Sequence, residues 1–185
     1  MVVQLLRHQF TVKQFHKMAE SGILSENDRV ELIRGEMIDM SPIGTRHSGC
    51  VIFLTNLLAL LLGGRALINV QNPVELDEIS EPQPDIALLK PHPDFYRNAH
   101  PQPEDIFLII EVADTTVKYD RQVKIPLYAE ANIPEVWLID VNQKIIEVYR
   151  HPHQGIYQDM QTLEKNQSLS IFAFPDVSIH VSEIF

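Results

Sequence analysis

The chain has 185 residues, of which 45% are hydrophobic, and this fits one globular domain spanning residues 1–185 better than two. Its formal net charge of −10, with no compensating basic run, argues against tight non-specific binding to nucleic acid. The lone Cys50 excludes an internal disulfide and favours a reducing, cytoplasmic location. The first residues lack a secretory signal pattern, and the apolar run at residues 51–62 is too short for a membrane span. A buried helix is therefore expected there.

Apolar periodicity and turn residues predict short helices and strands along the chain. The first half should hold a short helix capped by Thr11, a hairpin, and a long helix over residues 46–62 that Gly63 ends. The second half should hold strands and one helical stretch that ends near residue 131. The expected strands are residues 30–33, 36–40, 67–70, 74–76, 84–89, 106–113, 135–140, 145–149, 156–163, 169–172 and 177–181. The predicted fold class is α/β, with a mixed β-sheet flanked by helices.

One predicted strand carries a carboxylate in an apolar run. In the segment IFLIIEVA, Glu111 shares one strand face with three apolar side chains, because side chains alternate along a strand. These neighbours are Phe107, Ile109 and Ala113. A charge buried in such a stripe requires a cation, a set of hydrogen bonds or an exposed strand end. A structural ion pair with Arg or Lys explains Glu111 as well as a functional role does.

Asp85 begins the preceding short strand, directly after Pro84, and proline suits the start of a strand. Taken alone, Asp85 is an ordinary residue for a junction between loop and strand. If its strand and the strand of Glu111 are neighbours in the sheet, however, the two carboxylates open at the same edge. Clustered carboxylate oxygens are the ligands that Mg²⁺ or Mn²⁺ prefers.

The helical stretch that follows Glu111 contains Lys124. If the helix begins at Asp120, then Asp120, Lys124 and Tyr128 lie on one face at four-residue spacing. Pro126 conflicts with a straight helix, because proline lacks the N–H and crowds the carbonyl four residues earlier. The helix therefore either kinks or begins near Lys124 and leaves Asp120 outside. A solvent-exposed lysine is the ordinary alternative for Lys124.

These segments together resemble a known family. Pro84-Asp85 on a strand, followed by Glu111 in an apolar strand, is similar to the PD-(D/E)xK motif of restriction-endonuclease-like nucleases. The detailed resemblance is to an uncharacterised branch of that superfamily. Its ordered segments are present here as VELIRGEMIDMSP, a histidine near the next helix, PDIALL, LIIEV and YDRQVKIPLYAEANIPEVWLID. The resemblance implies a restriction-endonuclease-like core.

The resemblance also implies roles for individual residues. The superfamily motif places a lysine two residues after the glutamate, but Ala113 occupies that position here, and in this branch Lys124 is implied to supply the ammonium. Asp85 and Glu111 would hold one or two Mg²⁺ ions, or Mn²⁺, together with the backbone carbonyl of Val112. Lys124 would orient the attacking water or stabilise the transition state.

Three further residues are candidates for supporting roles. The resemblance points to Glu31 as a fourth catalytic residue. Glu31 and Glu36 flank the hairpin turn, and either could be a plain surface carboxylate, with Glu31 ranked first. His47 lies near the start of the long helix, where an anion could meet free backbone amides, although a surface histidine is the simpler interpretation.

The function implied is that of a Mg²⁺-dependent endonuclease that hydrolyses phosphodiester bonds of nucleic acid, with DNA as the expected partner. The superfamily resemblance also allows a homodimer. A non-catalytic binding or scaffold module on the same fold is an alternative, favoured by the charge of −10 and by the missing strand lysine. A phosphodiesterase acting on a small molecule is a second alternative, and the fold does not decide among the three.

Overall fold

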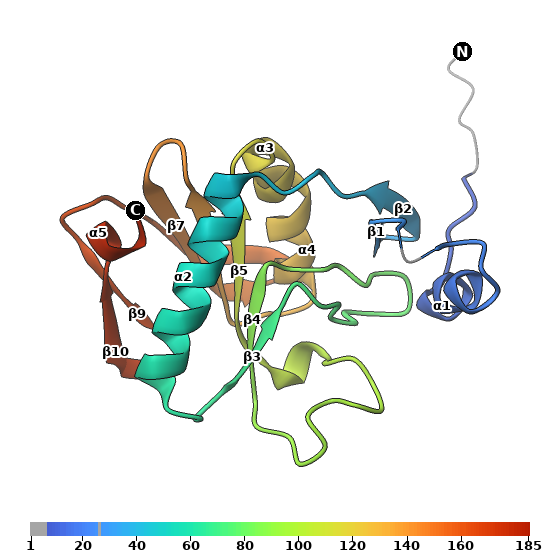
Figure 1. Ribbon diagram of the computed structural model, residues 1–185, viewed down its shortest axis with the longest axis horizontal. Helices are drawn as coiled ribbons and strands as arrows, with labels where there is room; N and C mark the ends of the chain where they lie inside the picture. Colours follow the sequence, from blue (N-terminus) through green and yellow to red (C-terminus); the bar gives the residue numbers. More distant parts are fainter. Residues whose placement is uncertain (1–6, 26) are drawn as a thin grey trace.

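The computed structural model describes residues 7–25 and 27–185, and its centre is a six-stranded mixed sheet (Figure 1). The strand order is β3-β4-β5-β6-β7-β8, and all neighbouring pairs are antiparallel except β5 and β6, which are parallel. The strands are β3 (Leu67–Val70), β4 (Ile86–Leu89), β5 (Ile106–Ala113), β6 (Glu135–Asp140), β7 (Ile145–His153) and β8 (Ile156–Leu163). The predicted mixed α/β fold is confirmed.

Helices and two small hairpins surround this sheet (Figure 1). The helical segments are α1 (Val12–Glu20), α2 (Thr45–Leu62), the 3₁₀ turn η1 (Pro103–Asp105), α3 (Val117–Tyr119), the π-helical η2 (Asp120–Lys124), α4 (Ile125–Glu130) and α5 (Val181–Ile184). The hairpins are β1 (Val30–Ile33) with β2 (Glu36–Asp39), and β9 (Ser168–Ile171) with β10 (Phe174–His180). As expected, Thr11 caps α1, and Gly63 ends α2 in the left-handed conformation at φ 55°, where glycine carries no Cβ penalty.

The sheet separates two apolar layers, which explains why β5 is apolar on both faces. Ile110 and Val112 pack into the layer that contains α2, whereas Ile109 and Ala113 pack into the layer that contains α4. Phe107 was expected to share the face of Ile109, but it packs against the α2 layer instead. The pairing register between β4 and β5 shifts near this end of the strands, and the shift moves Phe107 to the other face.

The expectation of a strand at residues 74–76 was wrong. These residues belong to a loop in which Val74 N–H donates to the carbonyl of Pro82 at 3.0 Å and Leu76 N–H donates to the carbonyl of Ser80 at 2.9 Å. The apolar pattern has another cause, because Val74 and Leu76 are buried in the α4-side layer. Burial without a regular ladder produces the same sequence pattern as a short strand.

Helix α2 carries large apolar side chains on its exposed face as well as on its buried face. Its inner face, which includes Leu54 and Leu58, is buried in the core, whereas Ile52 and Leu60 are 62% and 82% exposed. Within the described residues, α2 is the one helix long and apolar enough to cross a membrane by length and composition, with a mean hydropathy of 1.4 over its 18 residues, of which 28% are buried. The expected buried helix is therefore buried on one face only.

A buried ion pair fastens the β9–β10 hairpin to the sheet. The Oε1 of Glu135 accepts hydrogen bonds from Trp137 Nε1 at 3.0 Å and Arg150 Nε at 2.8 Å, while its Oε2 accepts from Phe172 N–H at 2.7 Å. Arg150 also donates to the carbonyl of Ser170 at 2.5 Å. Because Glu135 is fully buried, its charge depends on the three groups that donate to it, which belong to Trp137, Arg150 and Phe172.

We expect Glu135→Ala to lower the free energy of unfolding by about 3–5 kcal/mol, because the variant strands the Arg150 guanidinium beside a buried cavity. Urea denaturation measures this loss. The matched control is Glu130→Ala, which removes an exposed ion pair with Arg34 of 2.9 Å and should cost less than about 1 kcal/mol. Equal losses in the two variants would contradict the structural role assigned to Glu135.

Candidate active site

A cleft of about 660 Å³ opens where β5 ends and β4 begins. Its walls come from the β1–β2 hairpin, the start of α2, the loops before β4, the end of β5, and the segments α3 and η2. Its charged lining residues are Glu31, Asp39, Asp85, Glu111, Asp114, Asp120, Arg29, Lys118 and Lys124. Six carboxylates therefore face three basic side chains, so the cleft carries an excess of negative charge.

The pairing of β4 with β5 brings Asp85 beside the end of the Glu111 strand. The two strands are antiparallel neighbours, with Ile86 opposite Ile110, so the start of one strand lies next to the end of the other. The Oδ2 of Asp85 accepts a hydrogen bond from Val112 N–H at 2.8 Å. The sequence analysis expected Asp85 and Glu111 at the same edge of the sheet if their strands were neighbours, and the two strands are neighbours.

Lys124 lies between two carboxylates of the cleft. Its Nζ is 3.2 Å from Glu31 Oε2 and 3.2 Å from Glu111 Oε1. All three side chains are at most 6% exposed, so the ordinary alternative of a solvent-exposed lysine does not apply. Burial alone would lower the pKa of Lys124, but Glu111 and Glu31 outweigh burial and raise it, so the ammonium stays charged.

The π-helical segment η2 resolves the conflict that Pro126 posed. The chain stays helical from α3 through η2 into α4, and the wider turn lets Ile125 N–H donate to the carbonyl of Asp120. Pro126 then falls at the start of α4, directly after the wider turn. Asp120 therefore lies within the helical segment, and π-turns of this kind are frequent at functional sites.

Glu111 is held by a second polar group besides Lys124. Tyr128 in α4 donates its hydroxyl to Glu111 Oε1 at 2.5 Å, and both side chains are buried. Burial raises the pKa of Glu111 to about 8, against the opposing effect of the Lys124 charge, and the nearby Asp120 and Asp85 carboxylates raise it further. The site thus holds Glu111 in place while its negative charge remains only partly compensated.

Three groups from other residues hold the carboxylate of Glu31 in place. Besides Lys124, Gln83 N–H donates to Oε2 at 3.1 Å, and the hydroxyl of Tyr119 donates to Oε1 at 3.2 Å. Glu36, the other hairpin glutamate, is exposed and forms a surface ion pair with Arg7 at 2.8 Å. The structure therefore brings Glu31 into the cleft and leaves Glu36 outside it.

Asp85 is held by His47, which reaches it from the start of α2. The two side chains lie 2.9 Å apart, from His47 Nε2 to Asp85 Oδ1, and Gln71 donates to the same oxygen at 3.2 Å. Burial would raise the pKa of Asp85, but hydrogen bonding and charge from His47, with Val112 N–H and Gln71, lower it on balance. The pKa of Asp85 thus shifts toward the ionised form, in the opposite direction to the pKa values of Glu111 and Asp120. The sequence placed His47 near an anion site, and the partner in the structure is a carboxylate.

Asp120 is a further carboxylate of the cleft, beside Glu31, Asp85 and Glu111. It is buried, and Thr116 donates its hydroxyl to Asp120 Oδ2 at 2.6 Å. Burial raises the pKa of Asp120 despite this hydrogen bond and the Lys124 charge. Sequence reasoning missed the supporting residues Thr116, Gln71 and Gln83, because isolated polar residues in loops carry no periodic signal.

The donor set of the cleft fits a hard divalent cation. Carboxylates from several elements line one partly buried space, and burial raises the pKa of both Glu111 and Asp120, so added positive charge would be favourable there. Within the described residues, no three of these carboxylates bring one ligand atom each within 4.8 Å of one another, so a bound ion would have to draw them together. Among the described residues, His47 Nδ1 is the buried side-chain nitrogen or oxygen without a hydrogen-bond partner, and His47 is one of the residues that line the cleft.

We expect Glu111→Gln to stabilise the metal-free protein increasingly as the pH rises from about 5 to 8. The folded-state pKa of about 8 lies above the unfolded value of 4.5, so the wild type loses stability across this interval while glutamine does not titrate. The difference should reach roughly 1–3 kcal/mol. Thermal melts in chelator measure it, with the exposed Glu36→Gln as control.

A loss of stability in Glu111→Gln would mean that Lys124 depends on Glu111 for its charge compensation. If Lys124 depends on Glu111 alone, Glu111→Gln strands a buried ammonium and costs about 3–5 kcal/mol at every pH. A loss of that size that does not vary with pH would contradict the expected gain. The second contact of Lys124, to Glu31 at 3.2 Å, is the reason to expect the stabilising outcome.

Comparisons with known proteins identify the family and the fold of the chain. The family model Uma2, described as "Putative restriction endonuclease", matches residues 12–182. A crystal structure described as a putative nuclease belonging to DUF820 from Anabaena variabilis ATCC 29413 is similar with a TM-score of 0.72 and 17% identity, covering 95% of this chain and 97% of that chain. No curated protein matches the sequence. The likeness in structure shows a nuclease-like fold, and the family match shows that the chain belongs to the Uma2 family of restriction-endonuclease-like proteins.

Proposed function

We propose that the protein is a divalent-metal-dependent endonuclease that hydrolyses phosphodiester bonds of DNA. One observation carries the proposal: the buried Lys124 ammonium contacts Glu31 and Glu111 in a cleft that also holds Asp85. The family description supports nuclease activity. Within this proposal the protein acts as one cytoplasmic domain, and two copies acting together would present two clefts to one duplex.

Asp85 and Glu111 would hold Mg²⁺ or Mn²⁺ together with the backbone carbonyl of Val112, and Glu31 would complete the shell directly or through water. A bound ion supplies a water of lowered pKa and neutralises charge that develops on the phosphate. The six carboxylates of the cleft would otherwise repel the substrate.

The remaining contacts assign roles to residues of the chain itself. Lys124, held at 3.2 Å from two carboxylates, would orient the attacking water or stabilise negative charge in the transition state. Tyr128 would keep Glu111 in one orientation, and His47 would keep Asp85 ionised and in place. Each of these positioning groups comes from a helix, so the site rests on rigid elements.

Two observations favour the rival functions. The cleft volume of about 660 Å³ lies within the range of small-molecule pockets, which suits a phosphodiesterase acting on a small molecule. The net charge of −10 suits a binding or scaffold module that does not grip nucleic acid through phosphates. The substrate range of the purified protein separates the three functions.

We expect Mg²⁺-dependent cleavage of plasmid DNA that chelator abolishes and that Asp85→Asn lowers by at least about 100-fold, because a principal carboxylate donor is lost. The assay compares plasmid, linear duplex, single-stranded DNA, RNA and a small phosphodiester. The surface variant Asp176→Asn, which removes an exposed ion pair with Arg65, should keep full activity. Cleavage of the small phosphodiester alone would favour the small-molecule function, and cleavage of no substrate would favour the scaffold.

We expect Lys124→Ala to abolish cleavage and to lower the metal-free melting temperature, because Glu31 and Glu111 lose the cation between them. Metal binding should persist, since the lysine is not a ligand, and Mn²⁺ should restore much of the lost stability. Calorimetric titration with Mn²⁺ and thermal melts test this, with the exposed Lys165→Ala as control. Loss of Mn²⁺ affinity together with activity would show that Lys124 organises the ligands, contrary to the role proposed.

A further inference from the structure

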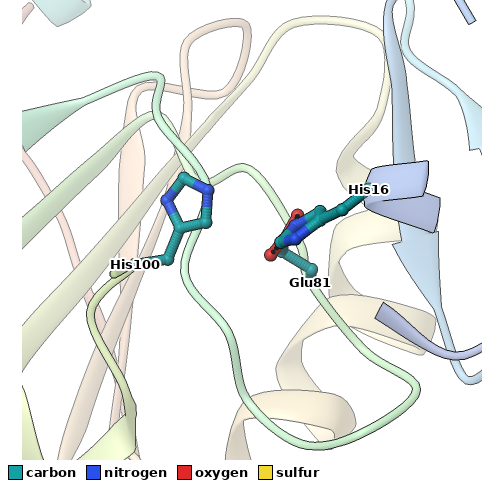
Figure 2. A group of neighbouring side chains, drawn as sticks. All are labelled: His16, Glu81 and His100. Atoms are coloured by element: carbon teal, nitrogen blue, oxygen red, sulfur yellow. Dashed lines mark hydrogen bonds and ion pairs between the residues drawn. The ribbon is translucent and has the colours of Figure 1, made fainter. Parts of the chain in front are cut away.

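A second group of metal-ligating side chains is formed by residues that do not line the cleft. His16 of α1, Glu81 of the loop before β4, and His100 of the loop before β5 bring one ligand atom each within 4.8 Å of one another (Figure 2). Among the described residues, this is the one such group of three. Figure 2 shows the three side chains converging from separate segments of the chain.

The carboxylate of Glu81 is the buried member of this group, with its side chain 2% exposed. Its backbone is fixed by pairing with Leu32 of β1, through hydrogen bonds of 2.7 and 3.3 Å. Both carboxylate oxygens face His16 Nε2, at 2.8 and 3.0 Å. A buried carboxylate needs strong compensation, and a single imidazole nitrogen serves both oxygens here.

His100 presents a second imidazole to the same point. The rings of His16 and His100 lie edge to face with centroids 5.7 Å apart, and both residues are partly exposed. Ligand atoms around a tetrahedral Zn²⁺ lie roughly 3.3 Å apart, given bonds of about 2.0–2.1 Å. The present ligand atoms, which all lie within 4.8 Å of one another, would have to move together by up to about 1.5 Å to reach that spacing.

We propose that His16, Glu81 and His100 form a Zn²⁺ site separate from the active-site cleft. Two imidazoles and one carboxylate are a ligand set that Zn²⁺ takes in proteins, with water in the fourth position. Imidazole nitrogen selects Zn²⁺ over Mg²⁺, which prefers oxygen ligands throughout. The donor chemistry therefore distinguishes this site from the oxygen-lined cleft.

The site would join three segments that are far apart in the sequence. The ion would fasten α1 and the loop before β5 to the segment around Glu81. That segment continues to Gln83, whose N–H holds Glu31, and to Asp85. Zinc at this site would stabilise the fold on the hairpin side of the cleft, whether or not the cleft has nuclease activity.

The experiment uses the variant Asp85→Asn/Glu111→Gln as the parent, so that binding in the cleft is suppressed. After stripping with chelator, the parent is titrated with Zn²⁺ in competition with a chromogenic chelator and with Co²⁺ as a visible probe. We expect one equivalent of Zn²⁺ to bind, a visible Co²⁺ band, and a rise in melting temperature with zinc. His100→Ala and His16→Ala in this parent should each weaken Zn²⁺ binding by at least about 100-fold.

His92→Ala is the matched control, because His92 is an exposed loop histidine that pairs with Asp94 and lies outside the group. It should bind Zn²⁺ as the parent does. Equal Zn²⁺ affinity in the parent, His16→Ala and His100→Ala would overturn the proposal, as would the absence of saturable binding by the parent. Mg²⁺-dependent activity of His100→Ala in the wild-type background reports on the nuclease proposal separately.

Discussion

Compensation of buried negative charge is the constraint on which the arrangement of the cleft depends. Glu31 and Glu111 come from different strands, and each is almost completely buried beside the ammonium of Lys124. Without that ammonium the two carboxylates would repel each other in a medium of low dielectric. The hairpin, the central sheet and the π-helical segment therefore meet at one cation, and Tyr119 and Tyr128 provide further hydrogen bonds to the same two carboxylates.

The fold handles its buried charges in two different ways. At Glu135, the indole N–H of Trp137, the backbone N–H of Phe172 and the guanidinium of Arg150 satisfy a single carboxylate, so that charge is matched and serves packing. In the cleft, six carboxylates face three basic side chains, so an excess of negative charge remains without compensation. This contrast separates a structural ion pair from a site suited to bind an additional cation, although both appear in the sequence as an acidic residue within an apolar run.

The local sequence pattern predicted the boundaries of those strands whose own residues determine where they begin and end. The boundaries of β5, β6 and β8 match the expected residues, because long apolar or alternating runs leave little choice of register. The strand expected at residues 74–76 failed, since burial in a loop imitates a strand pattern. The pairing of His47 with Asp85, and the support from Gln71, depend on where α2 and β3 meet β4 in space. No local pattern carries that information, so these contacts needed the structure.

The π-turn has a geometric consequence for the polar stripe of the helical segment. In a regular α-helix, side chains four residues apart drift by about 40° around the axis, so Asp120 and Tyr128 would diverge by about 80°. The wider turn from Asp120 to Lys124 takes up more residues per revolution and offsets the drift of the following α-helical turn. Asp120, Lys124 and Tyr128 can thus remain aligned over two turns. The angular phase of Asp120 relative to Tyr128 is therefore set by one irregularity in the backbone.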